Sequence, residues 1–153
     1  MALKRQQIID AVQSRLQLIN GTGAYYLNVA ANVYVQRATP YDSWESRELP
    51  GINITDGDEV PEQTLMAGAA NEWYRSLSVD IELMVNGTLS AEQVRKGIAD
   101  IQYAIGIDPT WSGLAIDSRW TETNIQKDQQ EQKIMAATVR MTILYQTVEW
   151  QED

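Results

Sequence analysis

The chain has 153 residues, a formal net charge of −9, and neither cysteine nor histidine. The missing cysteine excludes disulfides, a thiolate nucleophile and cysteine-ligated metals, and the missing histidine removes the commonest general base and metal ligand. The acidic balance opposes binding to nucleic acid or to an anionic membrane, because phosphate contacts need clustered lysine and arginine.

No apolar run approaches the roughly 18 residues of a membrane span, and the amino terminus lacks the apolar segment of a signal peptide. The length suits one domain with a core of its own. We therefore expect a single domain, residues 1–153, that is made and kept inside a cell.

The first predicted element is an amphipathic helix from Leu3 to Ile19. Its apolar stripe is Ile9, Val12, Leu16 and Ile19, widened by Ile8. The segment Asn20-Gly21-Thr22-Gly23 ends the helix. Its Gly-Thr-Gly could be read as a phosphate loop, but it follows a helix and has no third glycine or lysine, so a helix C-cap is the better interpretation.

The next segments are a short edge strand within Tyr25 to Gln36 and a long acidic loop at about residues 40–71. A short strand, Leu49 to Thr55, is embedded in this loop, and Asp56 to Pro61 is predicted as a turn. The Asp-Gly-Asp-Glu at residues 56–59 resembles a cation loop but lacks the EF-hand spacing, so a solvated acidic turn is expected.

The unit around which the chain is organised runs from Trp73 to Ile105 and is predicted as a strand, a tight turn and a helix. Apolar residues occupy every second position of the strand, with Arg75 as the exception, which is typical of a half-buried strand. These positions are Trp73, Leu77, Val79, Ile81, Leu83 and Val85. We expect this face, Trp73 included, to lie in the core.

The helix of this unit should begin near Ser90, because Asn86-Gly87 predicts a turn and Ser90 to Gln93 reads as a capping box. Gly106 and Pro109 should end it. One apolar stripe follows the helix and can pack on the strand: Ala91, Val94, Ile98, Ile101 and Ile105.

The carboxyl-terminal part is predicted as a hairpin of two long strands, Leu114 to Gln126 and Lys133 to Trp150, with a polar turn at residues 127–132. The first strand is polar on both faces, as suits an outer strand. The predicted fold is therefore α+β: a mainly antiparallel mixed sheet of about four to five strands, two helices packed on one face, and a long C-terminal β-hairpin.

Candidate chemistry is sparse. Asp80 and Glu82 share the polar face of the central strand and could form an acid/base pair, although two solvated carboxylates are the commoner case. Serine chemistry has no histidine to use. We expect a protein that is not an enzyme and that has no catalytic residue, cofactor or metal.

The aromatic residues are five tryptophans and seven tyrosines, without phenylalanine. Two interpretations stay open for the four tryptophans in loops or at strand ends: they close the ends of the core, or they contact another protein. These residues are Trp44, Trp111, Trp120 and Trp150.

The order of these elements resembles the tail terminator, or tail completion, proteins of long-tailed bacteriophages, over nearly the whole chain. Four features carry the resemblance: the amino-terminal amphipathic helix, Asn32-Val33-Tyr34 with Arg37 and Pro40 after it, the strand entry Leu49 to Ile54, and the hairpin ending Ala136 to Ile143. The acidic insert from Asp56 to Asn71 and the hairpin tip depart from the pattern.

Members of that family form a six-fold ring that caps the tail tube, stops its polymerisation and supplies the surface that joins the filled head. The resemblance implies a structural virion protein, assembled in the host cytoplasm and located at the head-proximal end of the tail. Its implied partners are copies of itself, the tail tube protein and a head–tail connector or neck protein. DNA would pass through the lumen without specific binding, and no membrane is involved.

The resemblance also suggests roles for particular residues. Subunit contacts would lie on the exposed side of the sheet and the hairpin, at Arg119, Trp120, Thr138, Arg140 and Thr142, where the two arginines would pair with an acid of the neighbouring subunit. The candidate residues for tube contact are Tyr41, Trp44, Arg47, Asp56, Asp58, Glu59 and Glu62. Asp80 and Glu82 are candidates for the lumen, where negative charge would keep passing DNA from sticking.

Two alternatives stay open. The first is another virion joint, namely a head–tail connector or neck protein. The second is a monomeric cytosolic protein-binding module that uses its tryptophan-rich rim.

Overall fold

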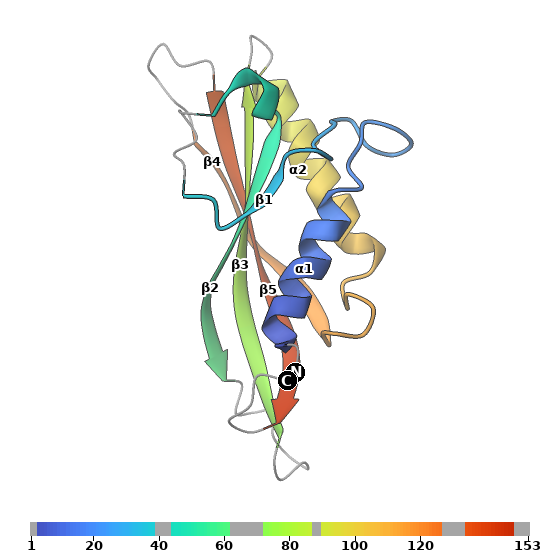
Figure 1. The fold of residues 1–153 in the computed structure, drawn as a ribbon, viewed down its shortest axis with the longest axis vertical. Helices are drawn as coiled ribbons and strands as arrows, with labels where there is room; N and C mark the ends of the chain where they lie inside the picture. The colour runs from blue at the N-terminus through green and yellow to red at the C-terminus, as the bar shows by residue number, and fades with distance from the viewer. Residues whose placement is uncertain (1–2, 39–43, 62–71, 87–89, 127–133, 149–153) are drawn as a thin grey trace.

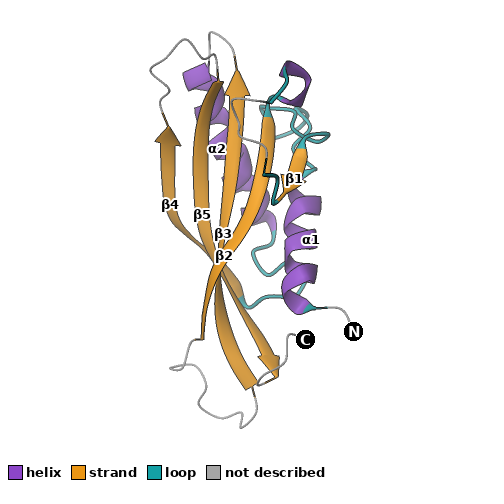
Figure 2. Cartoon of the chain, turned by 60° about the vertical axis from the view of Figure 1, so that its left-hand side comes forward, coloured by secondary structure: helices purple, strands orange, loops and turns teal. Residues whose placement is uncertain are grey.

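The fold was obtained as a computed structural model, which describes residues 3–38, 44–61, 72–86, 90–126 and 134–148 (Figure 1). A five-stranded mixed sheet carries both helices on one face (Figure 2). The elements are α1 (Lys4–Leu16), β1 (Val33–Val35), the 3-10 helix η2 (Ser46–Glu48), β2 (Gly51–Pro61), β3 (Glu72–Asn86), α2 (Ser90–Ile107), β4 (Asp117–Gln126) and β5 (Ile134–Val148). This confirms the predicted fold class.

The strand order is β1-β2-β3-β5-β4, with β1 parallel to β2 and every other neighbouring pair antiparallel. The central strand β3 therefore lies between β2 and β5. The predicted edge strand β1 and outer strand β4 occupy the two sides of the sheet, and β4 and β5 form the predicted C-terminal hairpin.

The main core lies between the sheet and the two helices. The alternating residues Leu77, Val79 and Ile81 of β3 are fully buried, as the period-two pattern predicts. From α1, Ile8 and Val12 are also fully buried. Burying apolar surface in this way is the main favourable term in folding, so these two periodicities largely determine how α1 meets the sheet.

Helix α2 lies very close to β3 at Gly97. A Cβ atom placed on Gly97 would be only 2.2 Å from Leu83 Cδ2 and 3.0 Å from Leu27 Cδ1. Val94 and Ile101 of the predicted stripe are buried, whereas Ala91 is exposed. The helix therefore does pack on the sheet through the predicted stripe, but Gly97 at the centre of the stripe sets the distance between helix and sheet.

The predicted turn at Asp56 to Pro61 is wrong, because β2 continues to Pro61 alongside β3. A register shift between Asp56 and Glu59 marks a β-bulge, so the strand accommodates the Asp-Gly pair and continues beyond it. The strand continues because β3 is long enough to pair with it, and because Arg5 Nε binds Asp56 Oδ2 at 2.8 Å.

The main core contains a charged pair where the end of β2 lies beside the start of β3. Arg75 is 6% exposed, and its Nη1 lies 3.2 Å from Glu59 Oε2. The hydroxyl of Tyr145 donates to the other oxygen of Glu59. Trp73, which we expected in the core, is only partly buried and has the Arg75 guanidinium 5.7 Å from its ring centroid. The apolar face thus ends in an ion pair covered by an aromatic ring.

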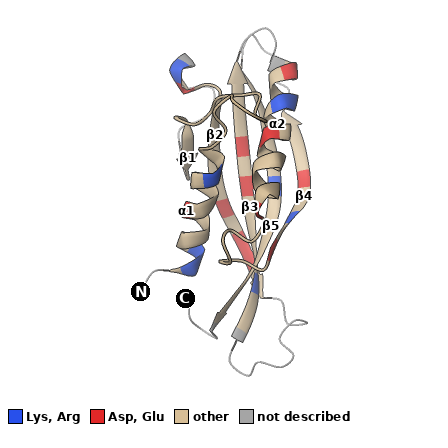
Figure 3. Ribbon diagram, turned by 90° about the vertical axis from the view of Figure 1, so that its right-hand side faces the viewer, with Lys and Arg blue, Asp and Glu red and all other residues tan. Residues whose placement is uncertain are grey.

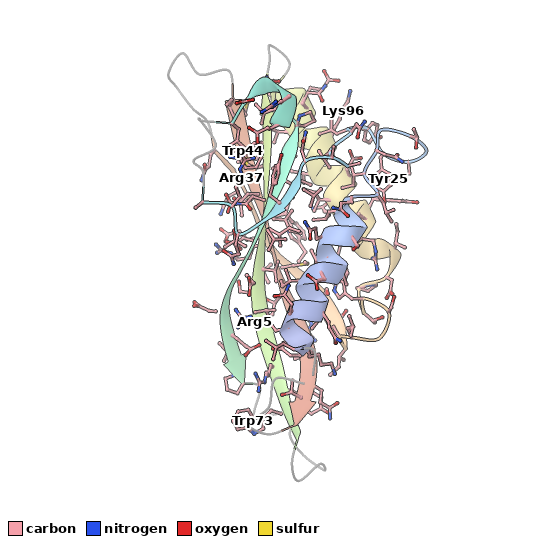
Figure 4. All side chains as sticks on the ribbon, viewed as in Figure 1. Arg5, Tyr25, Arg37, Trp44, Trp73 and Lys96 are labelled. Carbon is pink, nitrogen blue, oxygen red and sulfur yellow. The ribbon has the colours of Figure 1, made fainter. Side chains whose placement is uncertain are left out.

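A second, smaller core lies on the sheet face opposite the helices. It contains Trp44, Met84 and Ala136, with Tyr34 among its partly buried members. The Arg37 guanidinium lies 4.4 Å from the ring centroids of both Trp44 and Tyr34 (Figure 4). This cluster covers one end of that face, and no helix of the described residues covers the remainder.

Candidate functional site

The face opposite the helices, here called the open face, brings charged residues of three strands together. The strand register places Asp80 of β3 opposite Arg140 of β5, and Arg140 opposite Glu122 of β4. Figure 3 shows acidic residues at several levels along the central strands. The open face therefore has a row of charge that crosses β3, β5 and β4.

Arg140 is held by two acids of its own chain. Its Nε and Nη2 lie 2.8 and 3.2 Å from the two oxygens of Asp80, and its Nη1 lies 3.3 Å from Glu122 Oε2. The hydrogen bond to Asp80 raises the pKa of Arg140. The predicted pairing of Arg140 with an acid of a neighbouring subunit would have to compete with these bonds.

Glu82 has a different environment from Asp80. Burial raises the pKa of its carboxyl, the negative charge of Asp80 adds to this, and the hydrogen bond from Thr55 Oγ1 at 3.3 Å opposes it. The register places Glu82 opposite Thr138. Glu82 is therefore an acid whose ionised form is disfavoured by the fold, on a flat sheet surface.

Strand β4 presents the other candidate contact residues. Trp120 is 64% exposed, and the side chain of Arg119 is 74% exposed. The indole N–H of Trp120 donates to Thr123 Oγ1 at 2.8 Å, which holds the ring in place. A large apolar group that is exposed and already oriented loses little entropy on binding, which is a property of interface anchors.

An apolar groove of about 430 Å³ lies between α2 and β4, beside Trp120. Its lining contains no charged side chain: Gln102, Ile105, Gly106, Pro109, Ser118, Trp120, Val139 and Met141. An uncharged, mainly apolar lining suits an apolar segment of another molecule.

The loop after α2 forms a firm support for this groove. Asp108 accepts hydrogen bonds from the backbone and hydroxyl of Thr110 and from the backbone of Ser112, which lower its pKa to about 2. Trp111 and Ser112 have positive φ angles of 55° and 60°, a conformation that costs energy for residues other than glycine. The buried Trp111 donates to Ser118 Oγ at 2.7 Å, which ties the loop to β4.

The structure answers part of the question about the tryptophans. Trp44 and Trp111 are 5% and 1% exposed and close the core, whereas Trp120 is exposed. Trp150 and the predicted hairpin turn lie outside the described residues.

The candidates for tube contact are dispersed. Tyr41 and Glu62 lie outside the described residues, Trp44 is buried in the second core, and Glu59 is paired with Arg75. Arg47 and Asp58 are exposed, and Asp56 is bound by Arg5. Their common role therefore stays a prediction.

Two groups of residues were not foreseen from the sequence. One is the contact of the Arg37 guanidinium with the rings of Tyr34 and Trp44, which meet edge to face. The side chain of Asn53 supports it by binding the backbone N–H and C=O of Arg37 at 2.9 and 3.0 Å. The groove beside Trp120 was the other. Both join segments far apart in the chain, and the one available signal was the alternation that placed Trp120 on an outer strand.

Neither helix of the described part is long and apolar enough to cross a membrane. Among the same residues, the acidic side chains form no group of three or more that could hold a metal ion.

No protein family model matches the sequence, and no curated protein matches it. Among solved structures, the chain is similar to a chain of the virion of a native gene transfer agent (GTA) particle. The sequence identity is 11%, the TM-score is 0.41, and the match covers 95% of this chain and 92% of that chain. At this identity and TM-score the likeness does not establish a shared family or function.

Proposed function

We propose that the protein is a structural component of a tailed virion whose copies form a ring, hexameric as in the tail terminator proteins that the sequence resembles. The ring would cap the tail tube, end its polymerisation and form the surface that joins the head. This role needs contact surfaces and no active site. It places the protein at the head-proximal end of the tail.

The observation that carries the proposal is the one-sided sheet with an exposed, rigid edge. Both α-helices cover one face, and among the described residues only the second core covers part of the opposite face, so the rest of the open face and β4 are free for contact within that part of the chain. Trp120 on β4 is exposed and fixed by its bond to Thr123. The order of helices and strands also agrees with the order from which the resemblance was drawn.

A closed ring requires heterologous contacts, in which two different surfaces of neighbouring subunits meet. Strand β4 with Trp120 and Arg119 would supply one of these surfaces. Thr138 and Thr142 lie beside Arg140 on the open face and would extend the part of this surface that carries Arg119, whereas Trp120 lies on the helix side of β4. In this arrangement Asp80 and Glu82, one strand further from the β4 edge than Arg140, would line the lumen. Arg140 offsets part of the charge of Asp80, and the remaining negative charge of this group of acids would repel passing DNA.

The test is negative-stain electron microscopy of the purified protein, alone and with tail tubes assembled from the tube protein of the same genome. Rings with a central hole that cap tube ends are the expected result. Trp120→Ala should weaken the rings, whereas Tyr103→Ala, which also removes an exposed aromatic side chain, serves as the matched control. Tubes that grow past the expected length in the presence of the protein would contradict the proposal.

The groove beside Trp120 favours one other candidate, a monomeric module that binds an apolar segment of a different protein. Particles that stay small with and without tubes would favour that function. Rings that form but leave tube ends uncapped would favour a head–tail connector or neck protein.

A further inference from the structure

The exposed strand β4 has two halves whose side chains alternate out of phase. Before the bulge, Asp117 and Arg119 lie on the open face, and Ser118 and Trp120 lie on the helix side. The register shift between Trp120 and Glu122 inserts one extra residue. After it, Glu122 and Asn124 lie on the open face, and Thr123 and Ile125 lie on the helix side.

This phase shift allows the strand to pair with an identical strand. Residues directly opposite each other in an antiparallel pair must lie on the same face of the sheet. With a two-fold axis between residues 120 and 121, the first half of one strand faces the second half of the other. The pairs that flank the bulge then keep to one face: Asp117 with Asn124, Ser118 with Thr123, and Arg119 with Glu122.

The charges of the strand favour this register. Arg119 meets Glu122 of the second copy twice, once on each side of the axis, and opposite charges in directly opposed positions attract. A slip of two residues in one direction would oppose Asp117 to Glu122, which repel. A slip in the other direction would oppose Asp117 to Gln126 and Arg119 to Asn124, with no charge pair.

The same register brings the exposed apolar residues of the two β4 edges together. Ile116, which precedes the strand, and Ile125 are 45% and 48% exposed, and they would lie opposite each other. Trp120, 64% exposed, would lie beside the axis. Among the described strands none pairs with the outer edge of β4. Such an edge is a template for further strand pairing, and natural proteins cover edges of this kind.

Both charged groups are available for a new contact. The side chains of Arg119 and Glu122 are 74% and 49% exposed. Within its own chain Arg119 Nε is 3.6 Å from Asp117 Oδ2, and Glu122 is the longer of the two contacts of Arg140. Neither is committed to a short, buried bond.

We propose that a second copy of this chain pairs with β4 about this two-fold axis, giving a dimer with one continuous sheet. The pairing is isologous, so it differs from the heterologous contact that a ring needs and goes beyond the proposed function. Because it uses Arg119 and Trp120, the dimer would cover the contact strand while the protein is away from the tail.

The experiment uses two charge reversals, Arg119→Glu and Glu122→Arg, and their mixture. In each single variant the two cross-strand pairs carry like charges, so we expect the dissociation constant of the dimer to rise about tenfold or more. In an equimolar mixture, a dimer with one copy of each variant again brings opposite charges together in both pairs. Native mass spectrometry, in which the two variants differ in mass, and sedimentation equilibrium would measure the species.

The mixed dimer should therefore exceed either homodimer. Arg95→Glu, which reverses an exposed arginine on α2, is the matched control and should dimerise like the original protein. Circular dichroism of each variant checks that it is folded, and rescue by mixing itself requires folded partners.

Three results would overturn the inference: an original protein that is monomeric at about 100 µM, single variants that dimerise as well as the original, or a mixture that shows no preference for the mixed dimer. Six-fold rings that persist in both variants, without any dimer, would overturn this pairing and leave the proposed function standing. Dimers that form as described but never cap tubes would support this pairing and contradict the proposed function.

Discussion

Replacing Gly97 with alanine probes the closest contact between α2 and the sheet. The new Cβ would lie 2.2 Å from Leu83 Cδ2 and 3.0 Å from Leu27 Cδ1, well inside van der Waals contact. Leu83 is 1% exposed, so its side chain can move away only by disturbing packed neighbours. Either Leu83 changes rotamer or the helix moves outward.

The expected cost follows from two opposing effects. Overpacking a core costs about 1–3 kcal/mol, and alanine gains about 1 kcal/mol over glycine in a helix interior. The net effect of Gly97→Ala is a loss of about 1 kcal/mol in the free energy of unfolding. At about 2–4 °C per kcal/mol for a chain of this size, the melting temperature should fall by a few degrees.

Gly106→Ala is the matched control, because Gly106 lies in the same helix and a Cβ there would meet nothing within 4 Å. It should raise the free energy of unfolding by about 0.5 kcal/mol, since its position near the helix end reduces the propensity gain. Urea unfolding followed by circular dichroism would measure both variants. Equal stabilisation by the two substitutions would refute the close packing of α2 on Leu83.

Three further substitutions test the charged contacts. Arg37→Ala should lower the melting temperature by a few degrees, because Arg37 contacts the faces of two aromatic rings and pairs with Glu48, and the fluorescence of the neighbouring tryptophan should change. Glu59→Ala should cost about 3 kcal/mol in urea unfolding, because it removes the carboxylate that pairs with the buried Arg75. Glu82→Gln should raise the melting temperature at pH 7, because burial disfavours the ionised carboxyl and the amide oxygen can still accept from a hydroxyl. Arg47→Ala is the control for Arg37, since its side chain is 81% exposed and it should change little.

The sign of the Glu82 effect depends on pH. Its pKa is raised in the folded protein, so folding favours the protonated form, and the stability it contributes is lost as the pH rises through the folded pKa. The advantage of Glu82→Gln should therefore be present at pH 7 and vanish below the ordinary value of 4.5. An advantage that is equal at pH 7 and pH 4, or absent at both, would contradict the burial of this carboxyl. Arg37→Ala behaving like Arg47→Ala would likewise contradict the contacts of Arg37 with the two rings and Glu48.

The parts of the fold that could be predicted are those with strong local periodicity. The apolar alternation in β3 and β5 and the helical stripe of α1 each reflect one element meeting one core, so the pattern is visible within a few turns or residues. The outer position of β4 followed from polarity on both of its faces. These features yielded the fold class and the exposed strand that carries Trp120.

The lower half of β2 was missed because its local signal favours a different structure. An Asp-Gly pair at residues 56–57 is typical of a turn, but the long neighbouring strand and the side chains of Arg5 and Gln36, both distant in sequence, hold it in the sheet. Arg75 similarly interrupts an apolar alternation, and its partner Glu59 lies across the strand pair. Neither contact could be predicted from a local sequence pattern.

The candidate site shows the same division. Alternation along the chain was enough to assign Asp80, Glu82 and Arg140 to polar faces of their strands, because a strand's side chains point to opposite sides whatever surrounds it. That Arg140 is held by Asp80, that Trp44 is buried while Trp120 is exposed, and that a groove lies beside α2 depended on which distant segments come to lie together. Such contacts arise from packing between elements, and it was therefore the packed structure that distinguished a core tryptophan from one available to a partner.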